Sequence, residues 1–146
     1  MSVKTMSGLE IMQAYVAGTI PLASIAKTIP MQPHKAEKGN VTFYATADEN
    51  HLNPLGGVHG GFISTVMDSV TGCAVHTMLE AGAGYGTVDL NVKMLRPVPQ
   101  NVRLIAEGKV VHVSKSIAAS EGSLKDEDGK LYAHATATCM ILRPKG

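Results

Sequence analysis

The longest helical pattern of apolar residues in the chain begins near Phe62 and predicts the main helix of the fold. No helix-breaking residue occurs between Phe62 and Gly72. Apolar side chains recur there on one side of the helix, at Ile63, Val66, Met67, Val70, Ala74 and Met78. The preceding segment contains Pro54 and Gly56-Gly57, which disfavour regular structure. The pattern predicts a glycine-rich loop that leads into a helix ending near Leu79.

Shorter segments on both sides of this helix have the composition or the alternating pattern of strands. The predicted strands cover residues 21–31 and 41–47 before the helix, and 87–94, 102–113, 116–124 and 130–142 after it. A charged turn is expected at residues 34–40, and Asp128-Gly129 is a strong hairpin signal. A short helix over residues 8–16, capped by Ser7 and ended by Gly18, opens the chain. This order predicts an α+β fold with one long helix and a mostly antiparallel sheet of about six strands.

One helix can cover only one face of such a sheet. Residues 87–94 alternate cleanly, which assigns Thr87, Asp89, Asn91 and Lys93 to one face and Val88, Leu90, Val92 and Met94 to the other. Uncovered faces and unpaired strand edges favour association. We therefore expect the uncovered face or edge to pair with a second copy of the chain.

Composition narrows the class of protein. The 146 residues are enough for one domain, and 45% of them are hydrophobic, but only 4% are aromatic, so the core must be mainly aliphatic. A net charge of +1 without basic blocks argues against nucleic-acid binding. Cys73 and Cys139 lack metal or redox spacing, and we expect reduced thiols, no metal and no cofactor. Without a signal region or a long apolar run, a cytoplasmic protein is the default expectation.

The start of the long helix carries the candidate chemistry. The first N–H groups of a helix have no partner inside it and bear partial positive charge, so Gly60 and Gly61 could present donors to a polarised carbonyl oxygen. Asp68 lies off the apolar stripe, on a face lined mostly by small residues and within about 10 Å along the helix. These are the groups that acyl hydrolysis needs. The alternative is that the glycines only allow close packing and Asp68 is a solvated surface residue.

The motif Asn53-x5-His59-Gly60-Gly61-x6-Asp68 resembles the signature of the hotdog-fold acyl-CoA thioesterases of the phenylacetate-pathway (PaaI-like) type. The likeness extends roughly from Gly18 to Leu142, and includes residues 86–92 and the turn 95–99. It implies a single hotdog domain over residues 1–146, with residues 1–18 as a helical extension. It also implies hydrolysis of a small or medium acyl-CoA, aryl or aliphatic, by a homodimer that often assembles into a homotetramer. The active sites of that family lie at the dimer interface.

The resemblance assigns catalytic roles to five residues. Asp68 would act as a general base toward water or as a nucleophile, and the Gly60 N–H would hold the oxyanion. Asn53 would bond the thioester carbonyl or orient the water, or else only cap the loop. His59 would polarise a carbonyl or hold the loop through its side chain. Thr87 would place the attacking water or be an ordinary polar strand residue.

Other residues are expected to contact the substrate. Gly61 and Thr65 would lie against the thioester, while Arg96, Ser114 and Lys115 would bind the coenzyme A phosphates or be ordinary surface residues. The acyl pocket would be lined by the small helix face and by amino-terminal residues such as Leu9, Met12 and Leu22. Asp89 is a second candidate carboxylate. Two other functions stay open: a non-catalytic acyl-CoA sensor, and an acyl-thioester dehydratase or hydratase in which His59 acts with Asp68.

Overall fold

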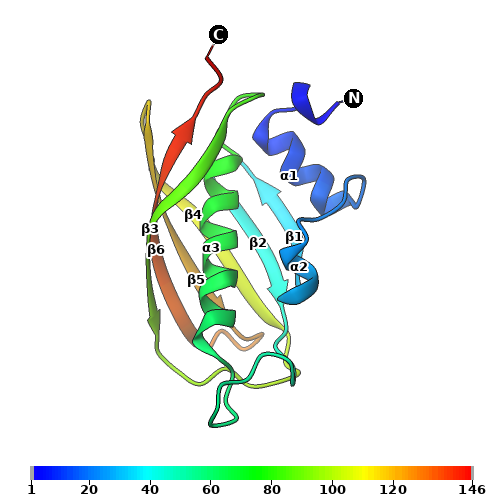
Figure 1. The fold of residues 1–146 in the computed structure, drawn as a ribbon, viewed down its shortest axis with the longest axis vertical. Helices are drawn as coiled ribbons and strands as arrows, with labels where there is room; N and C mark the ends of the chain where they lie inside the picture. The colour runs from blue at the N-terminus through cyan, green and yellow to red at the C-terminus, as the bar shows by residue number, and fades with distance from the viewer. Residues whose placement is uncertain (1, 146) are drawn as a thin grey trace.

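One long helix packed on an antiparallel sheet forms the centre of the molecule (Figure 1). The computed structural model describes residues 2–145. Its helices are η1 (Val3–Thr5), α1 (Gly8–Ala17), α2 (Ile25–Thr28) and α3 (Gly60–His76). Its strands are β1 (Met31–Glu37), β2 (Asn40–Ala45), β3 (Gly84–Met94), β4 (Leu104–Val113), β5 (Ile117–Lys125) and β6 (Leu131–Leu142), in the sheet order β1-β2-β4-β5-β6-β3. The predicted α+β order of elements is confirmed.

Helix α3 buries the predicted apolar stripe against the sheet. Val66, Met67 and Val70 are fully buried, and they contact a core that the strands β2, β4, β5 and β6 also line. The approach to β4 is unusually close: a Cβ on Gly108 would lie 2.0 Å from the carbonyl oxygen of Val70. Gly108 therefore allows the helix to pack directly on the strand backbone, which no larger residue permits.

Helix α1 is docked on the carboxyl-terminal end of α3. Ser7 and Glu10 form the predicted capping box, and Gly18 ends the helix with φ of 75°. The N–H of Gly8 donates to the carbonyl of Leu79 at 3.0 Å. Met12, on the inner side of α1, is 1% exposed. The α1–α2 segment thus lies along the right-hand side of α3 in Figure 1.

The prediction of a strand at residues 21–31 is wrong, as is the charged turn at 34–40. Pro21 and Pro30 bound a segment that instead contains the single turn of α2, and β1 starts only at Met31. Pro33 is tolerated in β1 because this is an edge strand, and a register shift follows it. The turn before β2 is reduced to Lys38-Gly39, with Gly39 at φ of 80°.

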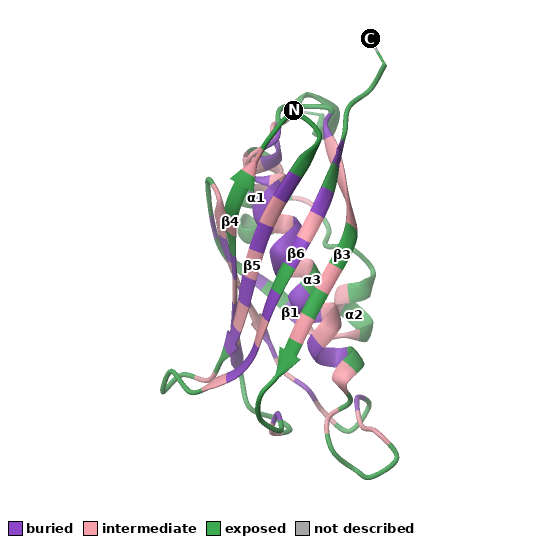
Figure 2. Cartoon of the chain, turned by 90° about the vertical axis from the view of Figure 1, so that its left-hand side faces the viewer, coloured by how far each residue is buried: buried purple, intermediate pink, exposed green. Residues whose placement is uncertain are grey.

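Strand β3 forms the other edge of the sheet and is bonded only to β6 within residues 2–145 (Figure 2). The predicted alternation fails at its start, because the register shifts between Thr87 and Asp89. Thr87 pairs with the buried Cys139, whereas Asp89 pairs with Thr138 on the opposite face. The bulge therefore turns Thr87 toward α3 and leaves Asp89 on the outer face of the sheet.

Candidate functional site

The loop before α3 is shaped mainly by Asn53. Its side-chain oxygen accepts hydrogen bonds from the N–H groups of Leu55 (2.9 Å) and Gly57 (3.1 Å). Its own N–H donates to the carbonyl of Gly57 at 2.7 Å. These contacts fit the loop-capping interpretation of Asn53, because its oxygen is fully occupied. Its side-chain NH₂ group has no acceptor within residues 2–145 and remains a donor.

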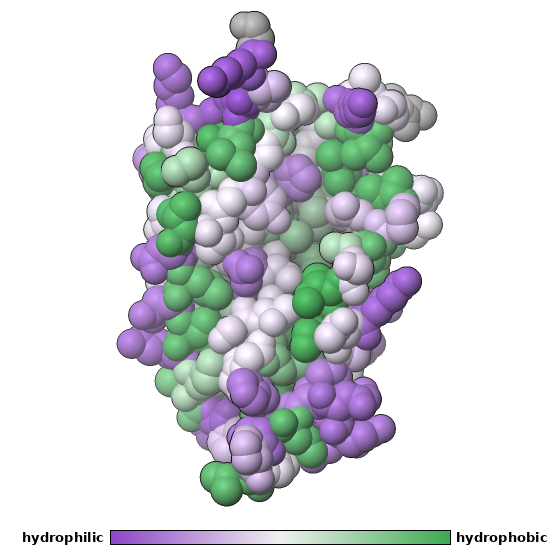
Figure 3. All heavy atoms as spheres, in the orientation of Figure 1, coloured by the Kyte–Doolittle hydropathy of each residue, from purple (hydrophilic) through white to green (hydrophobic). Residues whose placement is uncertain are grey.

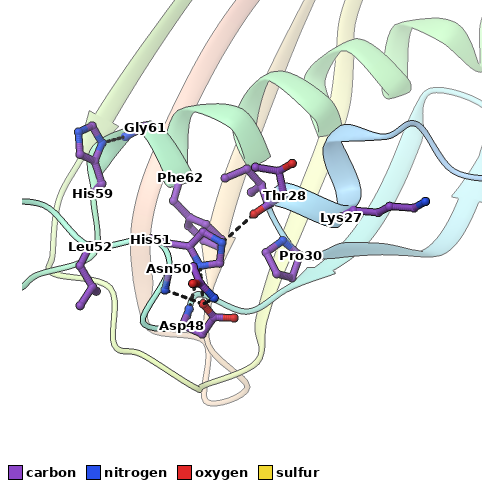
Figure 4. Close-up of a pocket in the computed structure, with 11 residues that line it drawn as sticks. Lys27, Thr28, Pro30, Asp48, Asn50, His51, Leu52, His59, Gly61 and Phe62 are labelled. Carbon is purple, nitrogen blue, oxygen red and sulfur yellow. Dashed lines mark hydrogen bonds and ion pairs between the residues drawn. The ribbon is translucent and has the colours of Figure 1, made fainter.

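A second residue, His51, fixes the loop, and sequence reasoning missed it. Its Nδ1 accepts from the N–H of Asp48 at 3.0 Å and its Nε2 bonds the carbonyl of Thr28 at 2.8 Å, so the neutral ring carries its proton on Nε2. The ring also lies 5.2 Å from that of Phe62 (Figure 4). His51 thus joins the loop, α2 and the first turn of α3. No motif in the chain marks it, since its partners come from three separate segments.

A cavity of about 550 Å³, lined by both polar and apolar residues, opens beside this end of α3 (Figure 4). On one side the cavity is lined by His51, His59 and Gly61. On the opposite side it is lined by α2. The lining residues are Lys27, Thr28, Ile29, Pro30, Asp48, Asn50, His51, Leu52, His59, Gly61 and Phe62.

His59 and the two glycines define the helix start. The Nδ1 of His59 accepts the N–H of Gly61 at 2.7 Å, so this histidine is the N-cap and holds the loop, one of its two expected roles. The N–H of Gly60 has no acceptor within residues 2–145. A Cβ on Gly60 would lie 2.9 Å from the end of the Met94 side chain, so Met94 covers this position. One N–H is engaged and its neighbour is left free at the positive end of the helix.

Asp68 lies near the middle of α3 with its carboxylate unpaired within the described residues 2–145 and exposed. The Thr87 hydroxyl on β3 lies 3.9 Å from the Cys139 sulfur. Burial raises the pKa of Cys139, and the negative charge of Asp68 adds to this effect. Asp68 and Thr87 therefore both influence the Cys139 thiol, but no hydrogen bond joins the Asp68 carboxylate to the Thr87 hydroxyl within residues 2–145.

Residues 55–133, more than half of the chain, match the thioesterase superfamily. The chain belongs to this superfamily. It is 28% identical to human acyl-coenzyme A thioesterase 13 over 104 residues, which cover 70% of this chain and 74% of the human protein. The expected hotdog fold is thereby confirmed.

Solved structures agree with this membership. The phenylacetic acid degradation-related protein of Ralstonia eutropha is 32% identical, with a TM-score of 0.79 over 88% of this chain and 98% of that one. This confirms the predicted likeness to the phenylacetate-pathway thioesterases. A thioesterase protein of Streptococcus pneumoniae, solved with coenzyme A, shares the fold at 21% identity and a TM-score of 0.73, over 81% of this chain and 92% of its own.

In this member of the thioesterase superfamily, the predicted catalytic groups lie far apart from each other, and so do the residues predicted to bind coenzyme A. Gly60 and Asp68 are eight residues apart on α3, which corresponds to ~12 Å along its axis. Arg96 follows β3 near the start of α3, whereas the Ser114-Lys115 turn lies at the other end, where the Lys115 carbonyl accepts from Arg143. A single chain therefore does not gather these groups around one small ligand.

The hydroxyl groups of two further predicted site residues, Thr65 and Ser114, are bonded to backbone carbonyls. The Thr65 hydroxyl donates to the Gly61 carbonyl at 2.8 Å, so it is engaged within the helix. The Ser114 hydroxyl donates to the Ile117 carbonyl at 3.0 Å. Residues 2–145 contain no cluster of three or more His, Cys, Asp or Glu side chains suited to a metal ion. They also contain no helix with the length and apolarity needed to cross a membrane.

Proposed function

We propose that this protein is an acyl-CoA thioesterase that converts a small or medium acyl-CoA into the free acid and coenzyme A. The observation that carries the proposal is the pair of free groups on α3: within residues 2–145 the Gly60 N–H has no acceptor and the exposed Asp68 carboxylate has no partner. Membership of the thioesterase superfamily and the coenzyme A in the pneumococcal neighbour support it.

The chemistry assigned to these residues is simple. The Gly60 N–H donates to the thioester oxygen as negative charge develops there, which is worth about 3–4 kcal/mol for one such donor. Asp68 takes a proton from a water that attacks the carbonyl carbon, or attacks that carbon itself and forms an anhydride that water then cleaves. In both routes the C–S bond breaks and the coenzyme leaves as a thiol. The Thr87 hydroxyl orients the water.

Two copies of the chain are needed for one site. A thioester group is too small to touch both Gly60 and Asp68 of the same helix, which are ~12 Å apart along its axis. The open edge of β3 offers a place for a second copy. This strand of 11 residues contains no fully buried residue, and within residues 2–145 no strand pairs with its outer edge. We assign the Gly60 amide to one copy and the Asp68 carboxylate to the other.

The same pairing accounts for the coenzyme contacts. Antiparallel pairing along β3 brings the amino-terminal end of α3 in one copy toward the opposite end of its partner. Arg96 of one copy and Ser114-Lys115 of the other would then approach the same phosphates. Gly61 and Thr65 would contact the thioester end of the substrate, and the free NH₂ group of Asn53 would donate to it.

Thiol release from a panel of acyl-CoAs tests the proposal. Asp68→Asn should fold normally and lose at least about a hundredfold in kcat, the scale of a positioned base. Glu37→Gln is the matched control: it removes an exposed carboxylate from β1, the edge of the sheet opposite β3, and should retain activity. Full activity in Asp68→Asn would eliminate Asp68 as the catalytic carboxylate.

The alternative functions give different outcomes in the same panel. Binding of acyl-CoA without any thiol release would identify a sensor. Loss or gain of a double bond in the acyl chain would identify a dehydratase or hydratase. The histidine geometry disfavours the lyase, because His59 accepts through Nδ1, which leaves a protonated Nε2 rather than a basic nitrogen for the substrate.

A further inference from the structure

The loop of residues 48–59, which lies between β2 and α3, has a single buried residue, His51. His51 is 7% exposed, whereas Leu55 at the tip of the loop is 97% exposed. Figure 3 shows many polar side chains at this lower end of the molecule. Gly56, with φ of 87°, adds backbone freedom. Hydrogen bonds rather than apolar packing must therefore hold the loop, and His51 is the residue placed to make them.

All four hydrogen-bonding groups of His51 are engaged. Its backbone N–H donates to the Asp48 carbonyl at 3.1 Å, and its backbone carbonyl accepts from the N–H of His59 at 2.8 Å. The ring accepts from the N–H of Asp48 through Nδ1 at 3.0 Å and donates to the carbonyl of Thr28 through Nε2 at 2.8 Å. Thr28 is the last residue of α2, so this bond satisfies a carbonyl that the helix leaves free.

The path from His51 to the Gly60 amide is short. The Gly60 N–H shares a planar peptide group with the His59 carbonyl, so the two point in opposite directions. That carbonyl accepts from the N–H of Phe62 at 3.0 Å, and the N–H of His59 is held by His51. The Phe62 ring lies 5.2 Å from the His51 ring (Figure 4). His51 therefore bonds one, and packs on the other, of the two residues that fix the direction of the Gly60 N–H.

We propose that His51 is a positioning residue: it ties the loop and α2 to the first turn of α3 and thereby aims the Gly60 N–H at the thioester oxygen. This inference rests on the proposed function. An oxyanion donor is effective because its direction is fixed before the reaction, and a misplacement of about 1 Å can lower the rate on the order of a hundredfold. Both ring nitrogens of His51 are already bonded, so the residue acts through Gly60 and not on the substrate.

Substitutions can remove the two ring bonds of His51 separately. Asn places an amide oxygen near the position of Nδ1 and keeps the acceptor for Asp48, whereas Gln places an NH₂ group near the position of Nε2 and keeps the donor to Thr28. With hexanoyl-CoA, kcat should fall about a hundredfold in His51→Ala and about tenfold in His51→Asn and His51→Gln. KM should change by less than about threefold, because the residues assigned to the coenzyme phosphates lie on other segments.

Val41→Ala is the matched control for a loss of stability. Val41 is fully buried in β2, and its truncation lowers Tm through a core cavity without a change in the loop. Its kcat should stay within about twofold of the wild-type value. Wild-type kcat in His51→Ala, or an equal loss of kcat in Val41→Ala, would overturn the positioning role.

A double-mutant cycle shows whether His51 acts through the Gly60 amide. Gly60→Pro removes this N–H, so the further change His51→Ala should lower kcat by at most about threefold in that background. If the two losses multiply instead, His51 acts independently of the amide. That result would overturn the inference and leave the thioesterase activity in place.

Amide hydrogen exchange tests the same role without turnover. His51→Ala should reduce the protection of the His59 and Gly61 N–H groups by at least about tenfold, and Val41→Ala should not, because these amides exchange through local opening of the loop. Absence of thiol release from every acyl-CoA in the wild-type protein would refute the proposed function, and exchange would still decide on His51. Unchanged protection in His51→Ala contradicts the inference, and a loss confined to the loop supports it.

Discussion

Gly60 is the residue on which the catalytic argument depends most at the atomic scale. Its N–H is the first donor of α3 and has no acceptor within residues 2–145, while its neighbour Gly61 is held by His59. The motif identified this position from sequence, because glycine at a helix start permits close approach. It could not show which of the two N–H groups is free. That depends on the His59 ring, whose orientation is set by the folded loop.

Gly60→Pro should remove the donor without disturbing the helix. Proline suits the first helical position, and the preceding His59 already has φ of −66° and ψ of 138°, which proline requires of its predecessor. We expect kcat to fall by about 10²–10³-fold with little change in Tm. Gly60→Ala is the control: it keeps the N–H, and its Cβ meets only the flexible end of Met94. Equal activities of the two variants would show that this amide is not the oxyanion donor.

At the scale of elements, the periodicity of apolar residues predicted helices and strands correctly where one face of the segment is buried in the core. The long helix, the capping box at Ser7 and the four later strands follow from their patterns, with boundaries shifted by a few residues. The errors fall where another interaction dominates. The α2–β1 region is shaped by prolines and by contacts with α1 and His51, and the bulge after Thr87 reverses the alternation of β3. Neither effect has a local sequence signature.

The close packing of α3 on β4 can be tested by substitution. Gly108→Ala would place a Cβ 2.0 Å from the Val70 carbonyl oxygen, and helix or strand must move to relieve the clash. We expect a loss of stability of about 1–3 kcal/mol, the usual cost of overpacking a core. Gly84→Ala is the matched control on β3, since its Cβ would meet no atom within 4 Å. Denaturant unfolding measures both, and equal stabilities would contradict the close packing of α3 on β4.

At the scale of the whole molecule, the sequence pattern predicted the order of elements, and the resemblance implied the hotdog fold and an active site at the dimer interface. Neither indicated which catalytic group comes from which copy. Spacing in the sequence places Gly60 and Asp68 near each other on one helix, whereas the helix holds them ~12 Å apart along its axis. The two edges of the sheet also differ. Strand β1 has seven residues and contains Pro33, which cannot donate a backbone hydrogen bond, whereas β3 has eleven residues and no proline. These features lead to the central claim that two copies form each site.

Mixing two inactive variants tests this claim most directly. Asp68→Asn and Gly60→Pro, each inactive alone, are co-expressed or unfolded and refolded together, and thiol release from hexanoyl-CoA is measured. If each site combines Gly60 of one copy with Asp68 of the other, half of the dimers are mixed and each holds one intact site, so about a quarter of wild-type activity should return. If both groups act from the same chain, every site keeps one defect and the mixture stays inactive, which would contradict the shared site.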